Sequence, residues 1–187
     1  NITEEQILFP WFVDFRNHIQ EGLIKSNSER DVFRVVSQDG KPYIVKYSHP
    51  SSVFQKTRSS LYPKLASEFE SHELLKKAGI PVVEACGWGS NGSESMLITE
   101  ELVPSESVRT YWFAKAVKDE SLRKEFLAKF ADFLKAFLDA GIYHPDFHPG
   151  NILIKSDSLD FILVDPYGVE KMKKEDQGKI FEMLCII

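Results

Sequence analysis

The sequence predicts an α+β fold, with a small antiparallel sheet in the first half and a mainly helical part in the second. Three strand-like segments follow one another over residues 21–48, and a turn signal joins the last two. A long amphipathic helix over residues 121–140 then precedes a short apolar hairpin. Strands and helices thus come in separate runs, unlike the strand–helix alternation of a parallel sheet.

The first strand-like segments cover residues 21–25, 31–37 and 41–47. Asp39 and Gly40 stand between the last two, and both residue types tolerate the positive φ angles of a tight hairpin turn. An antiparallel meander is therefore expected across these segments.

A loop and then a helix are predicted after the meander. Residues 48–63 contain Pro, Ser and Thr and are expected to form the loop. Residues 65–78 have a helical pattern, and Gly79 and Pro81 follow as a helix-ending glycine and proline.

A linker is predicted near the middle of the chain. Residues 96–99 form a short apolar strand, and the acidic, proline-containing residues 100–106 follow it. This segment is expected to join two lobes. The N-terminal lobe would then cover residues 1–99, the hinge residues 100–106 and the C-terminal lobe portion residues 107–187.

The clearest helix covers residues 121–140 and is stopped by Gly141. Its apolar residues recur every three or four positions, so one face of the helix is predicted to lie in the core. This stripe consists of Leu122, Phe126, Leu127, Phe130, Phe133, Leu134, Phe137 and Leu138.

A hairpin and a last helix are expected after this stripe. Two short apolar strands, residues 152–155 and 161–164, surround a turn at residues 156–158. Residues 173–187 begin another helix, and the chain stops inside an apolar run. The C-terminal lobe is therefore expected to be incomplete and to continue past Ile187.

The bulk composition is that of an ordinary globular protein, with 43% hydrophobic and 27% charged residues in 187 positions. A net charge of −5 argues against nucleic acid as the main partner, because a phosphate backbone requires a basic surface. No apolar stretch approaches the roughly 20 residues that span a bilayer, and no secretory signal opens the chain. The two cysteines, Cys86 and Cys185, are far apart, which suits a reducing cytoplasm. A cytoplasmic protein is expected, and peripheral contact with the inner face of the membrane stays open.

The densest polar cluster is the loop from His144 to Asn151, between the long helix and the hairpin. The second strand of the hairpin ends at Asp165, so this residue and Asn151 are expected to converge. One amide oxygen and one carboxylate suit Mg²⁺, which takes few protein ligands. Asp146, in the same loop, is placed to accept a proton from an attacking hydroxyl as a catalytic base.

The pattern H-x-D-x-x-x-x-N with a strand-terminal Asp resembles the catalytic loop and metal-binding Asp of the protein kinase-like superfamily. The resemblance implies a two-lobed kinase-like fold that uses ATP and Mg²⁺. It also implies a lysine on the third strand that pairs with the nucleotide phosphates, and Lys46 fits this position. Strand alternation puts Ile44 on the same face, where it could pack against adenine.

A kinase-like fold also needs a Glu on the following helix to orient the lysine. Glu68, Glu70 and Glu73 are candidates, and the spacing before Gly79 favours Glu68.

The hinge of a kinase-like fold follows its fifth strand, at Thr99 and the residues after it. The resemblance makes Thr99 the gatekeeper, and it makes Glu100 and Leu102 the backbone contacts to adenine.

Three positions depart from the pattern of a eukaryotic protein kinase. Ser26–Arg30 stands where a glycine-rich loop is expected, although backbone N–H groups of this turn could still cover phosphates. Pro145 replaces the Arg of H-R-D, and Asp165–Gly168 replaces D-F-G. These features resemble the small-molecule side of the superfamily more closely.

Within that side, three stretches resemble the lipopolysaccharide kinase family, which phosphorylates the core sugars heptose or Kdo. They are residues 67–81, 97–100 and 140–144. The motif His148–Asn151 is equally typical of aminoglycoside- and fructosamine-type phosphotransferases.

The favoured hypothesis is an ATP- and Mg²⁺-dependent kinase that acts on a sugar hydroxyl of the lipopolysaccharide core. A small-molecule or protein acceptor is the first alternative. A pseudokinase that binds nucleotide or a partner without transfer is the second, because the glycine-rich loop is missing. Outside this set, His144 is expected to be structural and His148 to pack in the loop. A surface position is favoured for Arg30 over a contact with phosphate.

Overall fold

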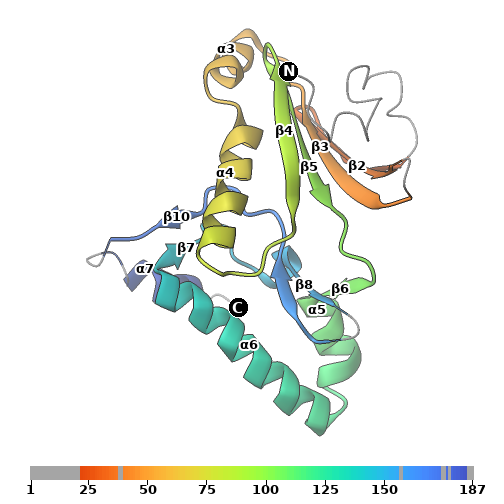
Figure 1. Cartoon of the computed structure of the whole chain (residues 1–187), viewed down its shortest axis with the longest axis vertical. Helices are drawn as coiled ribbons and strands as arrows, with labels where there is room; N and C mark the ends of the chain where they lie inside the picture. Colours follow the sequence, from red (N-terminus) through yellow and green to blue (C-terminus); the bar gives the residue numbers. More distant parts are fainter. Residues whose placement is uncertain (1–21, 38–39, 156–157, 174–175, 177, 185–187) are drawn as a thin grey trace. The chain divides into compact units, whose positions relative to one another are not determined.

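The computed structural model divides into two compact units (Figure 1). The first unit contains Asn1–Phe69 and Glu84–Glu101, and the second contains Glu70–Val83 and Leu102–Ile187. The structure describes residues 22–37, 40–155, 158–173, 176 and 178–184. The lobe boundaries expected from the sequence stay a prediction.

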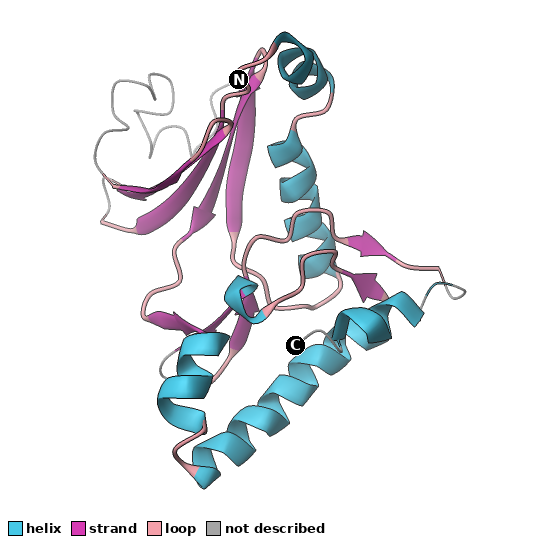
Figure 2. Cartoon of the chain, turned by 180° about the vertical axis from the view of Figure 1, so that it is seen from behind, coloured by secondary structure: helices cyan, strands magenta, loops and turns pink. Residues whose placement is uncertain are grey.

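The first unit is built on a five-stranded antiparallel sheet with the order β1-β2-β3-β5-β4, whose strands are magenta in Figure 2. The predicted meander and the predicted strand at residues 96–99 are both confirmed. The strands are β1 Leu23–Ser26, β2 Arg30–Val36, β3 Pro42–Ser48, β4 Ala85–Asn91 and β5 Glu94–Glu100.

Strand β4 was not expected, and its composition explains why. It contains two glycines at Gly87 and Gly89 and no β-branched residue, so it lacks the usual strand signal. Its pairing with β5 supplies the structure that its own sequence does not specify.

Strand β3 alternates between the two faces of the sheet. Tyr43, Val45 and Tyr47 are buried, whereas Ile44 and Lys46 on the other face are half-buried. The buried face belongs to a small core that contains Phe33, Tyr43, Val45, Tyr47, Met96 and Ile98. This alternation places Ile44 and Lys46 on a common face, as the period of a strand requires.

The loop expected over residues 48–63 is instead largely a helix, α3 Val53–Leu61. Ser52 and Gln55 form a capping box at its start. The Gln55 N–H donates to the Ser52 Oγ at 3.2 Å, and the Ser52 N–H donates to the Gln55 side-chain oxygen at 3.1 Å. This exchange satisfies backbone donors that a helix start otherwise leaves unpaired.

The predicted helix over residues 65–78 is present as α4 Lys64–Lys77. Gly79 follows it with a φ of 73°, as expected for a helix-ending glycine. The division between the two units falls inside α4, after Phe69.

The longest helix of the second unit is α6 Glu120–Ala140, which confirms the predicted helix (Figure 2). The Asp119 carboxylate accepts from the first turn of the helix, and Gly141 ends it with a φ of 65°. One expectation for the apolar stripe is wrong, because Leu127 is 49% exposed. The buried aromatic residues of α6 are Phe126, Phe130, Phe133 and Phe137.

The predicted hairpin is also confirmed, as β8 Ile152–Lys155 and β9 Phe161–Leu163. Strand β6 Ser105–Ser107 adds to it, so the end of the expected linker is a strand. The remaining elements are α5 Val108–Tyr111, the π-helical segment η2 Trp112–Ala116, β7 Ile142–Tyr143, the 3-10 turn η3 Pro149–Asn151, β10 Glu170–Lys171 and α7 Gly178–Leu184.

Some predictions fall partly outside the described residues. They are Asp39 of the first hairpin turn, residues 156–157 of the second turn, and residues 174–175, 177 and 185–187 of the last predicted helix. No helix in the described part of the chain is long and apolar enough to cross a bilayer.

Candidate active site

The first constellation is an ion pair between Lys46 of β3 and Glu68 of α4. The Lys46 Nζ donates to the Glu68 Oε1, and the side chains are 12% and 0% exposed. Of the other candidates on α4, Glu70 is exposed and Glu73 is half-buried. The contact predicted for Glu68 is therefore present, and its role in nucleotide binding stays a prediction.

The burial of Glu68 explains why the two elements are held together at this point. A buried carboxylate that loses its cation is strongly destabilising, by about 3–5 kcal/mol for a buried pair. Strand β3 presents Lys46 because its neighbours Val45 and Tyr47 are turned into the core. Sheet alternation and helix register thus specify the pair together.

The predicted adenine residue Ile44 lies on the same strand face as Lys46. Ile44 is directly opposite Thr99 of β5, and Lys46 is opposite Leu97. Side chains that face each other across a ladder share one face of the sheet. Ile44 and the predicted gatekeeper Thr99, which is 5% exposed, are therefore neighbours.

The predicted hinge residues continue from this strand. Glu100 is the last residue of β5, and its N–H donates to the Glu84 carbonyl at 2.9 Å. The Leu102 carbonyl accepts from the Ser105 hydroxyl at 2.6 Å. The assignment of Glu100 and Leu102 as adenine contacts stays a prediction.

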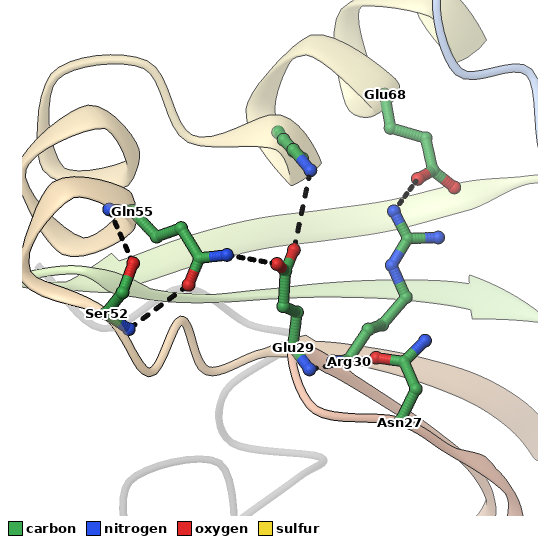
Figure 3. Close-up of polar contacts among 7 residues, drawn as sticks. Asn27, Glu29, Arg30, Ser52, Gln55 and Glu68 are labelled. Carbon is green, nitrogen blue, oxygen red and sulfur yellow. Dashed lines mark hydrogen bonds and ion pairs between the residues drawn. The ribbon is translucent and has the colours of Figure 1, made fainter.

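The turn between β1 and β2 is closed by Asn27 (Figure 3). Its side-chain oxygen accepts from the N–H of Glu29 at 2.9 Å and of Arg30 at 2.8 Å. Its own N–H donates to the Arg30 carbonyl at 2.9 Å. These three backbone donors are used inside the turn, which argues against the expectation that they cover phosphates.

The contact of Arg30 with Glu68 was not predicted from the sequence, which favoured a surface arginine at this position. The Arg30 side chain is 28% exposed, and its guanidinium lies 3.9 Å from the Glu68 carboxylate. The signal in the sequence is its position at the start of β2, because strand alternation can place it on the face of Lys46 once the pairing with β3 is known.

The second constellation is in the second unit, around Asp146. The Asn151 side-chain N–H donates to the Asp146 carbonyl at 3.1 Å, and a carboxylate oxygen of Asp146 lies at 3.5 Å. The His148 Nε2 is 3.7 Å from the other carboxylate oxygen. The Asp146 side chain is 75% exposed, so it can meet a substrate hydroxyl.

The buried side chain of His144 holds the backbone of this loop. It is 1% exposed, and its Nδ1 accepts from the Asp146 N–H at 3.0 Å. Phe147, 4% exposed, packs edge-on against Phe137 of α6 with ring centroids 4.9 Å apart. Two buried side chains thus hold the loop and turn Asp146 outward, which agrees with the structural role expected for His144.

His148 has a definite role in the loop, although none beyond packing was expected. Its Nδ1 accepts from the Gly150 N–H at 3.0 Å, so it caps the 3-10 turn that leads into Asn151. This cap fixes the backbone immediately before the hairpin.

The two ends of the hairpin meet, as expected from its length. Ile152 is opposite Leu163, and the Val164 N–H donates to the Asn151 carbonyl at 2.8 Å. Asp165 comes next, with a φ of 57°. Asp adopts this left-handed conformation more readily than most residues, and the extended backbone of β9, which ends at Leu163, does not continue through this position.

The donor set at these ends fits Mg²⁺. The Asn151 side-chain nitrogen donates to Asp146, so its amide oxygen is the atom that can ligate a metal. The carboxylate of Asp165 is a second oxygen donor. No group of three or more His, Cys, Asp and Glu gathers as a metal site among the described residues, so this pair would rely on water and phosphate oxygens.

Gly168 shows how the segment after Asp165 packs. Its φ is 78°, and a Cβ at this position would lie 3.1 Å from the Pro145 ring. A glycine is therefore required where this segment contacts the loop of Asp146.

The chain belongs to the lipopolysaccharide kinase (Kdo/WaaP) family, whose model matches residues 20–177. This match includes both constellations and confirms the resemblance predicted from the sequence. Membership of a kinase family makes the chain a phosphotransferase. A comparison with curated proteins finds no match.

Burial lowers the pKa of His144, although the backbone of Asp165 and the charges of Asp146 and Asp165 oppose this effect. The unfolded chain therefore binds a proton more readily than the folded chain below about pH 6.5. The contribution of His144 to stability is complete above that pH and is lost as the pH falls below it.

His144→Asn keeps an acceptor for the Asp146 N–H but does not titrate. We expect the melting temperature of the wild type to fall more steeply than that of His144→Asn between about pH 7 and about pH 5.5. Thermal unfolding at several pH values measures this difference. Equal slopes for the two proteins would contradict the burial argument.

Proposed function

We propose that this protein transfers the γ-phosphate of ATP, with Mg²⁺, to a hydroxyl group of a lipopolysaccharide core sugar. The observation that carries the proposal is the family match over residues 20–177, which contains Lys46, Asp146, Asn151 and Asp165. The buried pair of Lys46 with Glu68 and the donor set at the hairpin ends support it.

In the proposed reaction, Asp146 takes the proton of the attacking hydroxyl. The hydroxyl oxygen forms a bond to the γ-phosphorus, the bond between that phosphorus and the β–γ bridging oxygen breaks, and ADP leaves. Phosphoryl transfer requires mainly positioning and charge neutralisation from the protein. An exposed carboxylate whose backbone is held by a buried histidine meets the first requirement.

The other residues bind and orient the nucleotide. Lys46, held by Glu68, would bind the α- and β-phosphates, and Ile44 would pack against adenine. Glu100 and Leu102 would contact the adenine edge through their backbones. Asn151 and Asp165 would hold Mg²⁺, which neutralises phosphate charge when bound.

This assignment divides the chain as a kinase-like fold does. The proposed N-terminal lobe covers residues 1–99, the hinge residues 100–106 and the C-terminal lobe portion residues 107–187. Because ATP is a cytoplasmic substrate, we place the reaction in the cytoplasm, with an acceptor reached at the inner face of the membrane.

Asp146→Asn tests the base assignment. We expect the rate of phosphate transfer to fall by about 10²- to 10⁴-fold, because the amide cannot take the proton, while ATP affinity is retained. Transfer of labelled γ-phosphate to lipopolysaccharide core, with an aminoglycoside and a generic protein as parallel acceptors, measures the rate and the acceptor class.

Asp139→Asn is the matched control. The Asp139 side chain is 60% exposed on α6, and the substitution removes the same charge. A fully active Asp146→Asn variant would rule out the base. Transfer to an aminoglycoside or protein alone would replace the proposed acceptor, and nucleotide binding without any transfer would favour a pseudokinase.

Asp165→Asn tests the metal assignment. ATP with Mg²⁺ should raise the melting temperature of the wild type more than ATP with a chelator does, because the metal joins nucleotide and protein. We expect this difference to disappear in Asp165→Asn, while the metal-free effect of ATP persists. An unchanged difference, measured by thermal shift, would exclude Asp165 as a ligand.

A further inference from the structure

The carboxylate of Glu68 lies between two cations, and only one of them belongs to the kinase pattern. Lys46 contacts its Oε1. The Arg30 Nη2 lies 3.9 Å from its Oε2 (Figure 3). Glu68 is fully buried, whereas Arg30 is 28% exposed. The formal charges of the three side chains add to one positive charge, in a place that solvent still reaches.

Arg30 lies on the same face of the sheet as Lys46. In the pairing of β2 with β3, Arg30 is opposite Ser48 and Val32 is opposite Lys46. Opposite residues, and residues two apart on one strand, share a face. The two cations are therefore diagonal neighbours on the face that carries Ile44, and Glu68 lies within ion-pair distance of both.

The turn that leads into Arg30 is closed by hydrogen bonds from its own backbone N–H groups. A glycine-rich loop covers phosphates with backbone N–H groups, which are free to point at the ligand. In this turn, the N–H groups of Asn27, Glu29 and Arg30 are donated within the turn. The side-chain cation of Arg30, at the end of this turn, can contact phosphate in place of these backbone N–H groups.

The acidic residues beside Arg30 have their own partners. Glu29 accepts from the Gln55 side chain and lies 3.8 Å from the Lys64 amine (Figure 3). Asp31 accepts from the Ser26 hydroxyl at 2.6 Å and lies 2.9 Å from the His49 ring. The Glu29 and Asp31 carboxylates thus contact groups other than the Arg30 guanidinium.

We infer that Arg30 is a second phosphate-binding residue, which acts with Lys46 on the phosphates of the nucleotide while Glu68 holds both cations. This inference rests on the proposed function and extends it. The planar guanidinium presents several N–H donors and suits a phosphate better than a point charge does. Arg30 thus performs with its side chain what a glycine-rich turn performs with its backbone.

Arg30→Gln tests the inference through binding rather than through activity. Calorimetric titration with ADP in the presence of a chelator measures the phosphate site without metal, and titration with adenosine measures the base site. We expect ADP affinity to fall by about 10- to 100-fold, as for the loss of a charged hydrogen bond, and adenosine affinity to stay unchanged. Arg30→Lys, which keeps the charge, should show a smaller loss.

Arg58→Gln is the control, because it removes the same charge from an exposed position on α3. It should bind ADP as the wild type does. If the wild type binds ADP and Arg30→Gln binds it equally well, the inference is overturned and the proposed function stands. If the wild type does not bind ADP, both fail.

A double variant separates direct binding from a role through Glu68. If Arg30 only positions Glu68, adding Arg30→Gln to Glu68→Gln should cause no further loss of ADP affinity. We expect the further loss to persist, since Arg30 contacts phosphate itself. Its absence would reduce Arg30 to a positioning residue and contradict the inference.

Discussion

The buried carboxylate of Glu68 is the constraint on which the first constellation depends. A charge with no exposed surface requires a cation, and Lys46 provides it from the neighbouring strand. A buried ion pair gives little net stability, because the desolvation of two charges offsets most of their attraction. Its structural effect in this chain is therefore mainly one of orientation: the pair fixes the direction in which the Lys46 amine points.

The second constellation follows a different physical logic. Here the carboxylate proposed as the catalytic base is exposed, and buried neighbours hold its backbone. His144 and Phe147 are buried on either side of Asp146 in the sequence, and the hairpin holds Asn151 next to Val164, the residue before Asp165. The exposed carboxylate can take a proton, and the rigid support limits where it does so.

Some relations within both constellations could be predicted from local periodicity, whereas the pairing of Lys46 with Glu68 was predicted from the resemblance to the kinase-like superfamily. Alternation along β3 puts Lys46 opposite the buried Val45 and Tyr47, and hairpin length brings Asn151 to Asp165. Each of these relations involves neighbouring positions. A single sequence therefore contains enough information to place them.

The missed features depend on tertiary pairing. Strand β4 is held by β5 despite its glycines, and the exposure of Leu127 depends on which part of α6 is covered. Arg30 could be placed beside Glu68 only with the pairing of β2 and β3 in hand. Helix α3 is an exception, since the capping box of Ser52 and Gln55 was visible in the sequence.

The most direct test of the account is a crystal structure of the protein with Mg²⁺ and a non-hydrolysable ATP analogue. The account predicts one nucleotide whose α- or β-phosphate lies about 3 Å from the Lys46 amine. The metal on that nucleotide should bind the Asp165 carboxylate at about 2.1 Å. A nucleotide that contacts neither residue, or Lys46 and Asp165 pointing into separate regions, would contradict the central claim.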